Sequence, residues 1–456
     1  MNYKYNITGY ILHNDIQYFC TVNGFIVKMF YKGEPEIQKL HKIEAEDEKY
    51  LFGFSETDCI FAVLMPKGTC FNAFSSHIPY HFGTHILIKA KSSDVNDISY
   101  FDGLEFYGET VNKIFNPRQG VEHPKYAYKV EDINIAFKPH SDYSREYDIE
   151  IKEEKIKIKT IIYTYINLNE QKNEDGTVSL GALDSAVRFK FNTQKSLNEL
   201  YYYWLRFKEF LVFLAGRKNV DFGVRLLQKH ESDSLCYIAD GFFSGNSSDV
   251  YNGEIRKTIQ INMFEDKLPD LFMLFTDEKT LPYLPFLPKN NKEAKHISYT
   301  DVLDICTAFE IEFELSKLKI QSNDVANNLY IVLKNAIKEF RKNQVEEADQ
   351  KDKVFDVAFS NIQHINASLA DKIYLLYERS LIDLDSVSNN ELNTNRKSIN
   401  DFVKLRNNIT HSGIVDWGGC GVFFIFLLKI LYINMLMRAG LNKNTAVNIA
   451  ERKWGA

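Results

Sequence analysis

The chain has 456 residues, more than one hydrophobic core usually serves, so its length predicts several domains. Hydrophobic residues make up 45% and charged residues 25% of the chain, which excludes a disordered polypeptide. The net charge of −6 excludes a nucleic-acid partner held by a broad basic surface, so any nucleic acid must bind at a small, local site. The six cysteines form no Cys-x-x-Cys pair, which argues for reduced thiols in the cytoplasm and against a disulfide framework or a zinc site.

Residues 1–165 are expected to form a β-rich N-terminal domain. Apolar residues alternate or cluster in short runs, for example at 25–30 and 85–90, and turn formers such as Asn23-Gly24 separate the runs. A sandwich and a partial barrel both fit this pattern. The first ten residues lack the basic and apolar segments of a secretion signal, so secretion is not expected.

Residues 166–288 are interpreted as a mixed middle section, either separate from the N-terminal domain or part of it. Residues 196–215 have helical spacing, and Gly216 suits a helix C-terminal cap. The aromatic stretch at 201–204 could stack on nucleobases, but packing between domains is the preferred interpretation.

Residues 297–456 are expected to form an all-α bundle, which makes the whole chain α+β. No proline follows Pro288, as long helices require. An apolar run at 422–437 is interrupted by Lys429 and Asn434 and falls short of the ~20 residues of a membrane span, so a buried helix and no membrane are predicted. Helices are expected at 299–318, 324–343, 353–380 with a break near Asn366, 398–411 and 420–438.

The helix expected at 398–411 carries Arg406, Asn407 and His411 near its end. Asn407 and His411 are four residues apart and share a helix face, so the amide can orient the imidazole. Arg406 lies about 140° round an ideal helix from His411. The three side chains therefore come together only through a distorted last turn, a wrapping arginine side chain or a second subunit.

These residue types suit RNA cleavage without a metal ion. The reaction needs a base for the 2′-hydroxyl proton, an acid for the leaving 5′-oxygen and a cation for the phosphate. Histidine titrates near neutrality and arginine offers a planar fork to phosphate oxygens. Because each chain supplies one such histidine, a twofold dimer is expected to complete the site. By spacing alone, the better interpretation of Arg406 and His411 is that they are helix-end residues that contact free carbonyls.

The string Leu405-Arg406-Asn407-Asn408-Ile409-Thr410-His411, in a C-terminal bundle and before a very apolar helix, resembles the Arg-Asn-x3-His signature of HEPN ribonucleases. The layout resembles the ApeA-like branch of that family, as do Thr307-Ala308-Phe309-Glu310 and residues 99–110.

The resemblance implies a HEPN domain at 297–456 and a metal-independent endoribonuclease of bacterial antiphage defence, toxic to its host when triggered. It implies that Arg406 binds phosphate, Asn407 orients the histidine and His411 is the general acid or base. Glu310 is carried over as a further site residue, although an ordinary surface acid beside Glu312 and Glu314 is an equally good interpretation. The partners expected are an RNA substrate, with tRNA among the candidates, a second copy of the chain and a phage-derived trigger at the N-terminal domain.

No cofactor or metal site is expected. His77, His81 and His85 have helical spacing, but Pro79 and Gly83 argue for a loop with incidental histidines. No phosphate-binding glycine motif occurs. Two other functions stay open: a non-catalytic HEPN protein that binds RNA, nucleotide or a protein, and a carbohydrate-binding or adaptor protein acting through its β domain.

Overall fold

A computed structural model places most of the chain, which divides into two compact units, unit 1 (Met1–Asp277) and unit 2 (Glu278–Ala456). The structure describes residues 5–13, 16–31, 42–44, 47–72, 80–117, 121–122, 136–137, 145–151, 154–164, 183–230, 234–245, 258–290, 292–320, 324–343, 354–359, 362, 368–380, 396–412 and 420–455.

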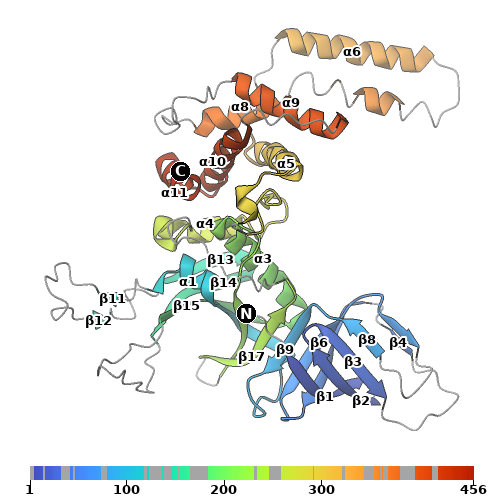
Figure 1. The fold of residues 1–456 in the computed structure, drawn as a ribbon, viewed down its shortest axis with the longest axis vertical. Helices are drawn as coiled ribbons and strands as arrows, with labels where there is room; N and C mark the ends of the chain where they lie inside the picture. The colour runs from blue at the N-terminus through green and yellow to red at the C-terminus, as the bar shows by residue number, and fades with distance from the viewer. Residues whose placement is uncertain are drawn as a thin grey trace. The chain divides into compact units, whose positions relative to one another are not determined.

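Unit 1 is built on one antiparallel sheet of thirteen strands in the order β13-β14-β15-β10-β16-β17-β9-β6-β5-β1-β2-β3-β8 (Figure 1). Two small two-stranded sheets, β4–β7 and β11–β12, accompany it. The strands are β1 (Asn6–His13), β2 (Ile16–Asn23), β3 (Ile26–Tyr31), β4 (Lys42–Glu44), β5 (Lys49–Ser55), β6 (Ile60–Met65), β7 (Cys70–Asn72), β8 (Tyr80–Gly83), β9 (Ile86–Ala90), β10 (Tyr100–Tyr107), β11 (Val121–Glu122), β12 (Ala136–Phe137), β13 (Arg145–Ile151), β14 (Glu154–Thr164), β15 (Leu183–Ser196), β16 (Gly223–Lys229) and β17 (Leu235–Phe243).

The N-terminal strands curl round a core of their own, as in a partial barrel. Alternate residues of each strand point inward, and Ile11, Tyr18, Val27, Val63 and Leu87 meet there, each almost fully buried. The turn between β2 and β3 uses Gly24 at φ 59°, a left-handed conformation that glycine adopts without strain. The β-rich N-terminal prediction is confirmed, and of its two forms the curled sheet is the one observed.

The middle section shares this sheet. β14 and β15 lie on either side of residue 165 and pair with each other along their length. β10 pairs with β15 on one side and β16 on the other. Strands far apart in the sequence therefore join the two expected sections into one sheet.

Helix α3 (Leu197–Ala215) covers one face of the sheet in this half of unit 1. It begins at a capping box formed by Ser196 and Glu199. It ends at Gly216 in the left-handed conformation, as the sequence predicts. Phe207 stacks on Phe106 of β10, with ring centroids 4.0 Å apart. Short helices α1 (Glu109–Ile114) and α4 (Leu268–Met273), and 3₁₀ turns at Ile261–Met263 and Glu265–Lys267, complete the described helical parts of unit 1.

The interpretation of the aromatic stretch at 201–204 as packing between domains is wrong for its two buried residues. Tyr203 and Trp204 are buried within unit 1. Trp204 stacks on Phe243 of β17 at 4.5 Å, nearly parallel, and Tyr203 lies 4.6 Å from Phe191 of β15. These rings therefore fasten α3 to its own sheet.

Unit 2 is helical. Its helices α5, α8, α9 and α10 contact one another as a bundle, and α11 packs on α10. Within the third predicted helix, the described residues 354–359 are helical and α8 begins at Leu369, whereas the break expected near Asn366 lies outside the described residues. The helices are α5 (Tyr299–Leu315), α6 (Asp324–Asn343), α8 (Leu369–Ser380), α9 (Arg396–Ser412), α10 (Cys420–Arg438) and α11 (Lys443–Trp454), with a 3₁₀ turn at Glu293–Lys295.

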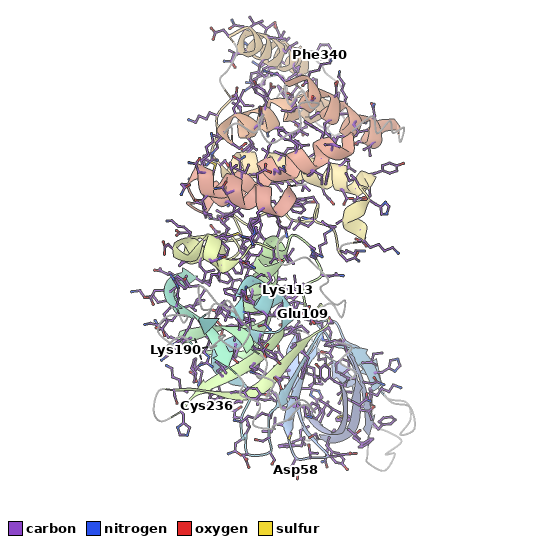
Figure 2. All side chains as sticks on the ribbon, turned by 60° about the vertical axis from the view of Figure 1, so that its left-hand side comes forward. Asp58, Glu109, Lys113, Lys190, Cys236 and Phe340 are labelled. Carbon is purple, nitrogen blue, oxygen red and sulfur yellow. The ribbon has the colours of Figure 1, made fainter. Side chains whose placement is uncertain are left out.

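Two features of unit 2 depart from expectation. The apolar helix α10 is followed by α11, which the sequence analysis missed although Asn442 caps it by accepting from the amide of Thr445 at 2.9 Å. Helix α6 keeps much of its apolar face exposed, including Val332 at 62% and Phe340 at 59% (Figure 2).

Helix α10 is the central helix of the bundle. By length and composition, its segment Gly421–Arg438 could cross a membrane, but 67% of that segment is buried against other parts of the protein. The two polar residues that interrupt the run have partners there. Lys429 forms an ion pair with Glu451 of α11 at 2.9 Å, and the Asn434 side chain donates to the carbonyl of Leu376 on α8 at 3.0 Å. Such a mostly buried helix is typical of the core of a soluble protein.

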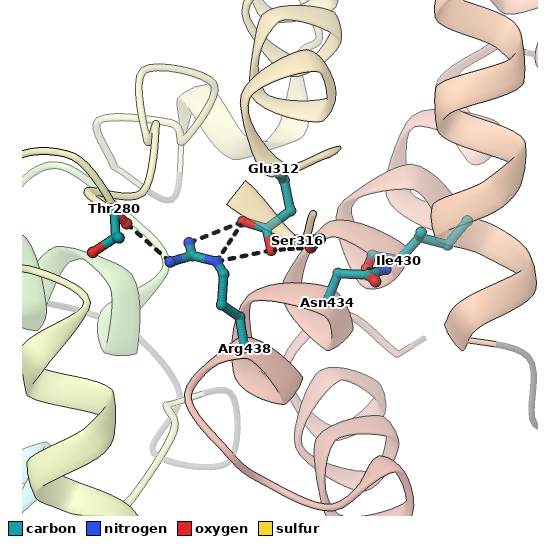
Figure 3. Close-up of polar contacts among 6 residues, drawn as sticks. All are labelled: Thr280, Glu312, Ser316, Ile430, Asn434 and Arg438. Atoms are coloured by element: carbon teal, nitrogen blue, oxygen red, sulfur yellow. Dashed lines mark hydrogen bonds and ion pairs between the residues drawn. The ribbon is translucent and has the colours of Figure 1, made fainter. Parts of the chain in front are cut away.

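A buried ion pair joins α5 to α10 (Figure 3). Glu312 is 1% exposed and accepts from Nε and Nη2 of Arg438, at 3.0 and 2.9 Å. Arg438 also donates through Nη1 to the carbonyl of Thr280 at 2.9 Å, and Ser316 donates to Glu312 at 3.2 Å. Burial raises the pKa of Glu312, and the adjacent guanidinium opposes that rise.

We expect Glu312→Ala to lower the stability of unit 2 by about 3–5 kcal/mol, because it leaves the Arg438 charge buried without its carboxylate. Glu314→Ala is the matched control. Glu314 is 70% exposed and pairs with Lys372, so its loss should cost about 0–1 kcal/mol. The stability loss in each variant is measured by hydrogen exchange of α5 and α10 peptides in the full chain. Equal protection of these peptides in the two variants would contradict the expectation.

Candidate functional site

Helix α9 presents the predicted motif, and its apolar face fixes how it lies. Ile399, Phe402 and Leu405 are buried, at spacings of three residues. The Phe402 ring lies 5.7 Å from Phe423 of α10, and α9 also contacts α5 and α8. Packing on three helices thus anchors α9 up to the residue before the motif.

The last turns of α9 leave the core. Asn407, Thr410 and His411 are exposed, whereas Arg406 is half-buried. The imidazole of His411 makes no hydrogen bond to any residue that the structure describes. His411 therefore stands in solvent at the end of an anchored helix, where a substrate could reach either ring nitrogen.

Arg406 turns toward its neighbour in the sequence. Its Nη1 donates to Oδ1 of Asn407 at 3.1 Å. Its Nε is buried and has no hydrogen-bond partner among the described residues. The Asn407 carbonyl oxygen thus holds the guanidinium, and Asn407 makes no hydrogen bond to His411 in the described chain.

Glu310 on α5 and Arg406 on α9 both affect the pKa of the same buried thiol, that of Cys306. Cys306 of α5 is 1% exposed, and burial raises the pKa of its thiol to about 12. The positive charge of Arg406 lowers that pKa and the negative charge of Glu310 raises it. The fold therefore places Glu310 and Arg406 near the same thiol. Sequence reasoning did not include Cys306, although its position four residues before Glu310 puts both on one face of α5.

The grouping of Glu310 with Glu312 and Glu314 as surface acids is wrong for Glu312. Glu314 is exposed, Glu310 is half-buried and Glu312 is fully buried against Arg438. Glu312 points to the opposite side of α5 from Glu310 and Glu314, because a helix turns about 200° over two residues.

The histidines at 77–85 do not share a helix. His81 is exposed on strand β8, and His85 precedes β9 and packs edge-on against Tyr201 at 5.4 Å. His77 lies outside the described residues. Within the described ranges, no group of three His, Cys, Asp or Glu side chains could hold a metal ion.

Comparison with protein-family models, with curated proteins and with solved structures gives no match to this chain. The functional argument therefore rests on the residues of the site and on their geometry.

We expect Cys306 to resist alkylation by iodoacetamide at pH 8.5 and to react more slowly than the exposed Cys236 (Figure 2) by roughly two orders of magnitude or more, because the thiolate is the nucleophile. Peptide mass spectrometry measures both rates, and urea-unfolded protein is the control in which the rates should become similar. Comparable rates in the native protein would mean that Cys306 is not buried as described.

Proposed function

We propose that this chain is a metal-independent endoribonuclease of the HEPN type. The observation that carries the proposal is the exposed end of α9, which presents His411 beside the hydrogen-bonded pair of Arg406 and Asn407. An accessible imidazole and an arginine held in place are two of the groups that RNA cleavage without a metal requires.

In the proposed reaction the 2′-oxygen attacks the adjacent phosphorus and the bond to the 5′-oxygen breaks. One His411 accepts the proton of the 2′-hydroxyl, and a second imidazole donates a proton to the leaving 5′-oxygen. Arg406 offers its fork of N–H donors to the phosphate oxygens while negative charge builds there. The products are a 2′,3′-cyclic phosphate and a free 5′-hydroxyl.

The second imidazole comes from a second copy of the chain in this proposal. A twofold axis that brings two α9 ends together would place two histidines and two arginines round one phosphodiester. The exposure of His411, and of Asn407 and Thr410 beside it, leaves this helix end open to such a partner.

Two positioning roles follow from the contacts of Arg406. Asn407 fixes the guanidinium through Oδ1, a role that differs from orienting the histidine. Glu310, whose charge acts on the same thiol as the charge of Arg406, is proposed to supply a negative charge in the same region of the site. The hydrogen bond to Asn407 reduces the freedom that Arg406 must lose when phosphate binds.

We further propose that the protein acts in the cytoplasm in antiphage defence by abortive infection, with tRNA among its candidate substrates. In this scheme unit 1 recognises a phage-derived trigger or the substrate, and unit 2 cuts RNA and is toxic when active. The resemblance to the ApeA-like HEPN family supports this role.

We expect His411→Ala and Arg406→Ala each to lower RNA cleavage by about 10²- to 10⁴-fold, the usual contribution of a proton-transfer group or a charge-stabilising donor. The assay incubates purified protein with total RNA in EDTA and maps the 5′-hydroxyl ends.

His296→Ala and Lys404→Ala are the controls, because both residues are exposed in unit 2 and lie outside the motif. Retained cleavage in both motif variants would refute the enzyme. RNA that is shifted in a gel but stays intact with the unaltered protein would favour the second candidate, a non-catalytic HEPN protein. That candidate is supported by the same exposed helix end, since a held arginine also suits phosphate binding alone.

Mixing subunits tests the composite site. When one part of unaltered protein equilibrates with nine parts of His411→Ala, random pairing leaves about 1% of dimers with two histidines, whereas independent subunits would retain about 10% of the activity. We expect the lower value after the chains have exchanged. Activity that simply follows the amount of unaltered protein would contradict a shared site.

A further inference from the structure

Charged side chains cross the sheet of unit 1 in a single row. The strand registers place one charged residue opposite the next on seven neighbouring strands. Directly opposite residues in an antiparallel sheet point to the same face. From β13 to β9 the row is Glu146, Lys159, Arg188, Glu105, Arg225, Asp240 and Lys89.

This row lies on the face of the sheet that α3 does not cover. Phe106 follows Glu105 in β10, and Phe189 follows Arg188 in β15, so both rings point to the opposite face. Both rings pack on Phe207 of α3, at 4.0 and 5.9 Å. The charged row therefore faces away from the aromatic core of unit 1.

The centre of the row is a network of ion pairs in which Arg188 and Arg225 flank Glu105, and Asp240 lies opposite Arg225. Glu105 is 3% exposed and accepts from Arg188 Nη2 at 2.6 Å and from Arg225 Nη1 at 3.1 Å. The Arg225 guanidinium also lies over the rings of Tyr107 and Tyr237, at 4.2 and 5.2 Å. One carboxylate thus stands between two arginines, which are about a quarter exposed.

Lysines extend this charge onto β14 and β15. Lys157 and Lys190 lie opposite each other, two residues along their strands from Lys159 and Arg188 and therefore on the same face. The acids that face the lysines of β14 are on the edge strand β13. Glu146 pairs with Lys159 at 2.9 Å and Asp148 with Lys157 at 4.0 Å. The pair of Lys157 and Asp148 is largely exposed and therefore weak, so an incoming anion can compete for Lys157.

We propose that this surface, formed by Lys157, Lys159, Arg188, Lys190 and Arg225 and called here the basic face, binds the phosphodiester backbone of RNA. A chain of net charge −6 needs a local grip of this kind, and lysine and arginine side chains replace the counterions of the backbone. The choice of RNA as the polyanion rests on the proposed function. The basic face gives unit 1 a part in substrate binding that is separate from α9.

The test measures binding of a fluorescent single-stranded RNA oligomer by anisotropy at several salt concentrations. The full chain carries His411→Ala so that the RNA stays intact. We expect Lys157→Glu with Lys190→Glu to weaken binding by about tenfold or more and to reduce the slope of log K against log salt by about 1.4, since each single-strand phosphate contact contributes about 0.7.

Lys28→Glu with Lys67→Glu is the matched control, because it changes the charge of unit 1 equally at exposed positions outside the basic face. We expect this control to keep the affinity and salt slope of its parent. Unchanged affinity in the basic-face variant, or an equal loss in both double variants, would overturn the proposal.

The outcome is separable from that of the nuclease proposal. If the unaltered protein cuts RNA and the basic-face variant binds RNA as tightly as its parent, the basic-face proposal is rejected and the nuclease proposal is not. RNA binding that depends on the basic face in a protein that never cuts RNA would support the basic face and reject the nuclease.

Discussion

The buried pair of Glu312 and Arg438 sets the geometry on which unit 2 depends. Removing two charges from water is costly, and the cost is offset only where each charge keeps its partner and its remaining donors and acceptors are satisfied. Arg438 meets that condition with both oxygens of Glu312 and with the carbonyl of Thr280. The register of α5 against α10 is fixed as a result. Cys306 and Glu310 lie on the preceding turns of α5, so the same pair determines what α5 presents to α9.

Much of the local structure is readable from the sequence because it depends on neighbouring residues. Period-two alternation gives the strands of unit 1, and a serine cap with a left-handed glycine bounds α3. The union of the N-terminal and middle sections was left open, since β10 pairs with residues at least 79 positions away in the sequence. The packing of Trp204 and the burial of Glu312 were missed for a related reason, because each depends on a partner contributed by a distant element.

The candidate site was likewise predictable from the sequence only where it depends on neighbouring residues. The sequence locates Arg406, Asn407 and His411 near the end of one helix, and the structure has that helix at Arg396–Ser412. Ideal helical geometry cannot say where a long side chain turns, and Arg406 meets the Asn407 amide that was expected to serve His411. Helical geometry also cannot show that Arg406 and Glu310 both lie near Cys306, because that depends on the packing of α5 against α9. The arrangement of two copies remains a proposal from chemistry.

The continuous sheet of unit 1 has a consequence for how this protein can be divided. A fragment ending at residue 165 would contain β10 and β14 but neither β15 nor β16, the strands with which they pair. Several rows of backbone amides and carbonyls would then lose their partners at once. Bare strand edges of this kind recruit other chains, so such a truncated product would tend to self-associate and precipitate instead of reporting on an isolated β domain.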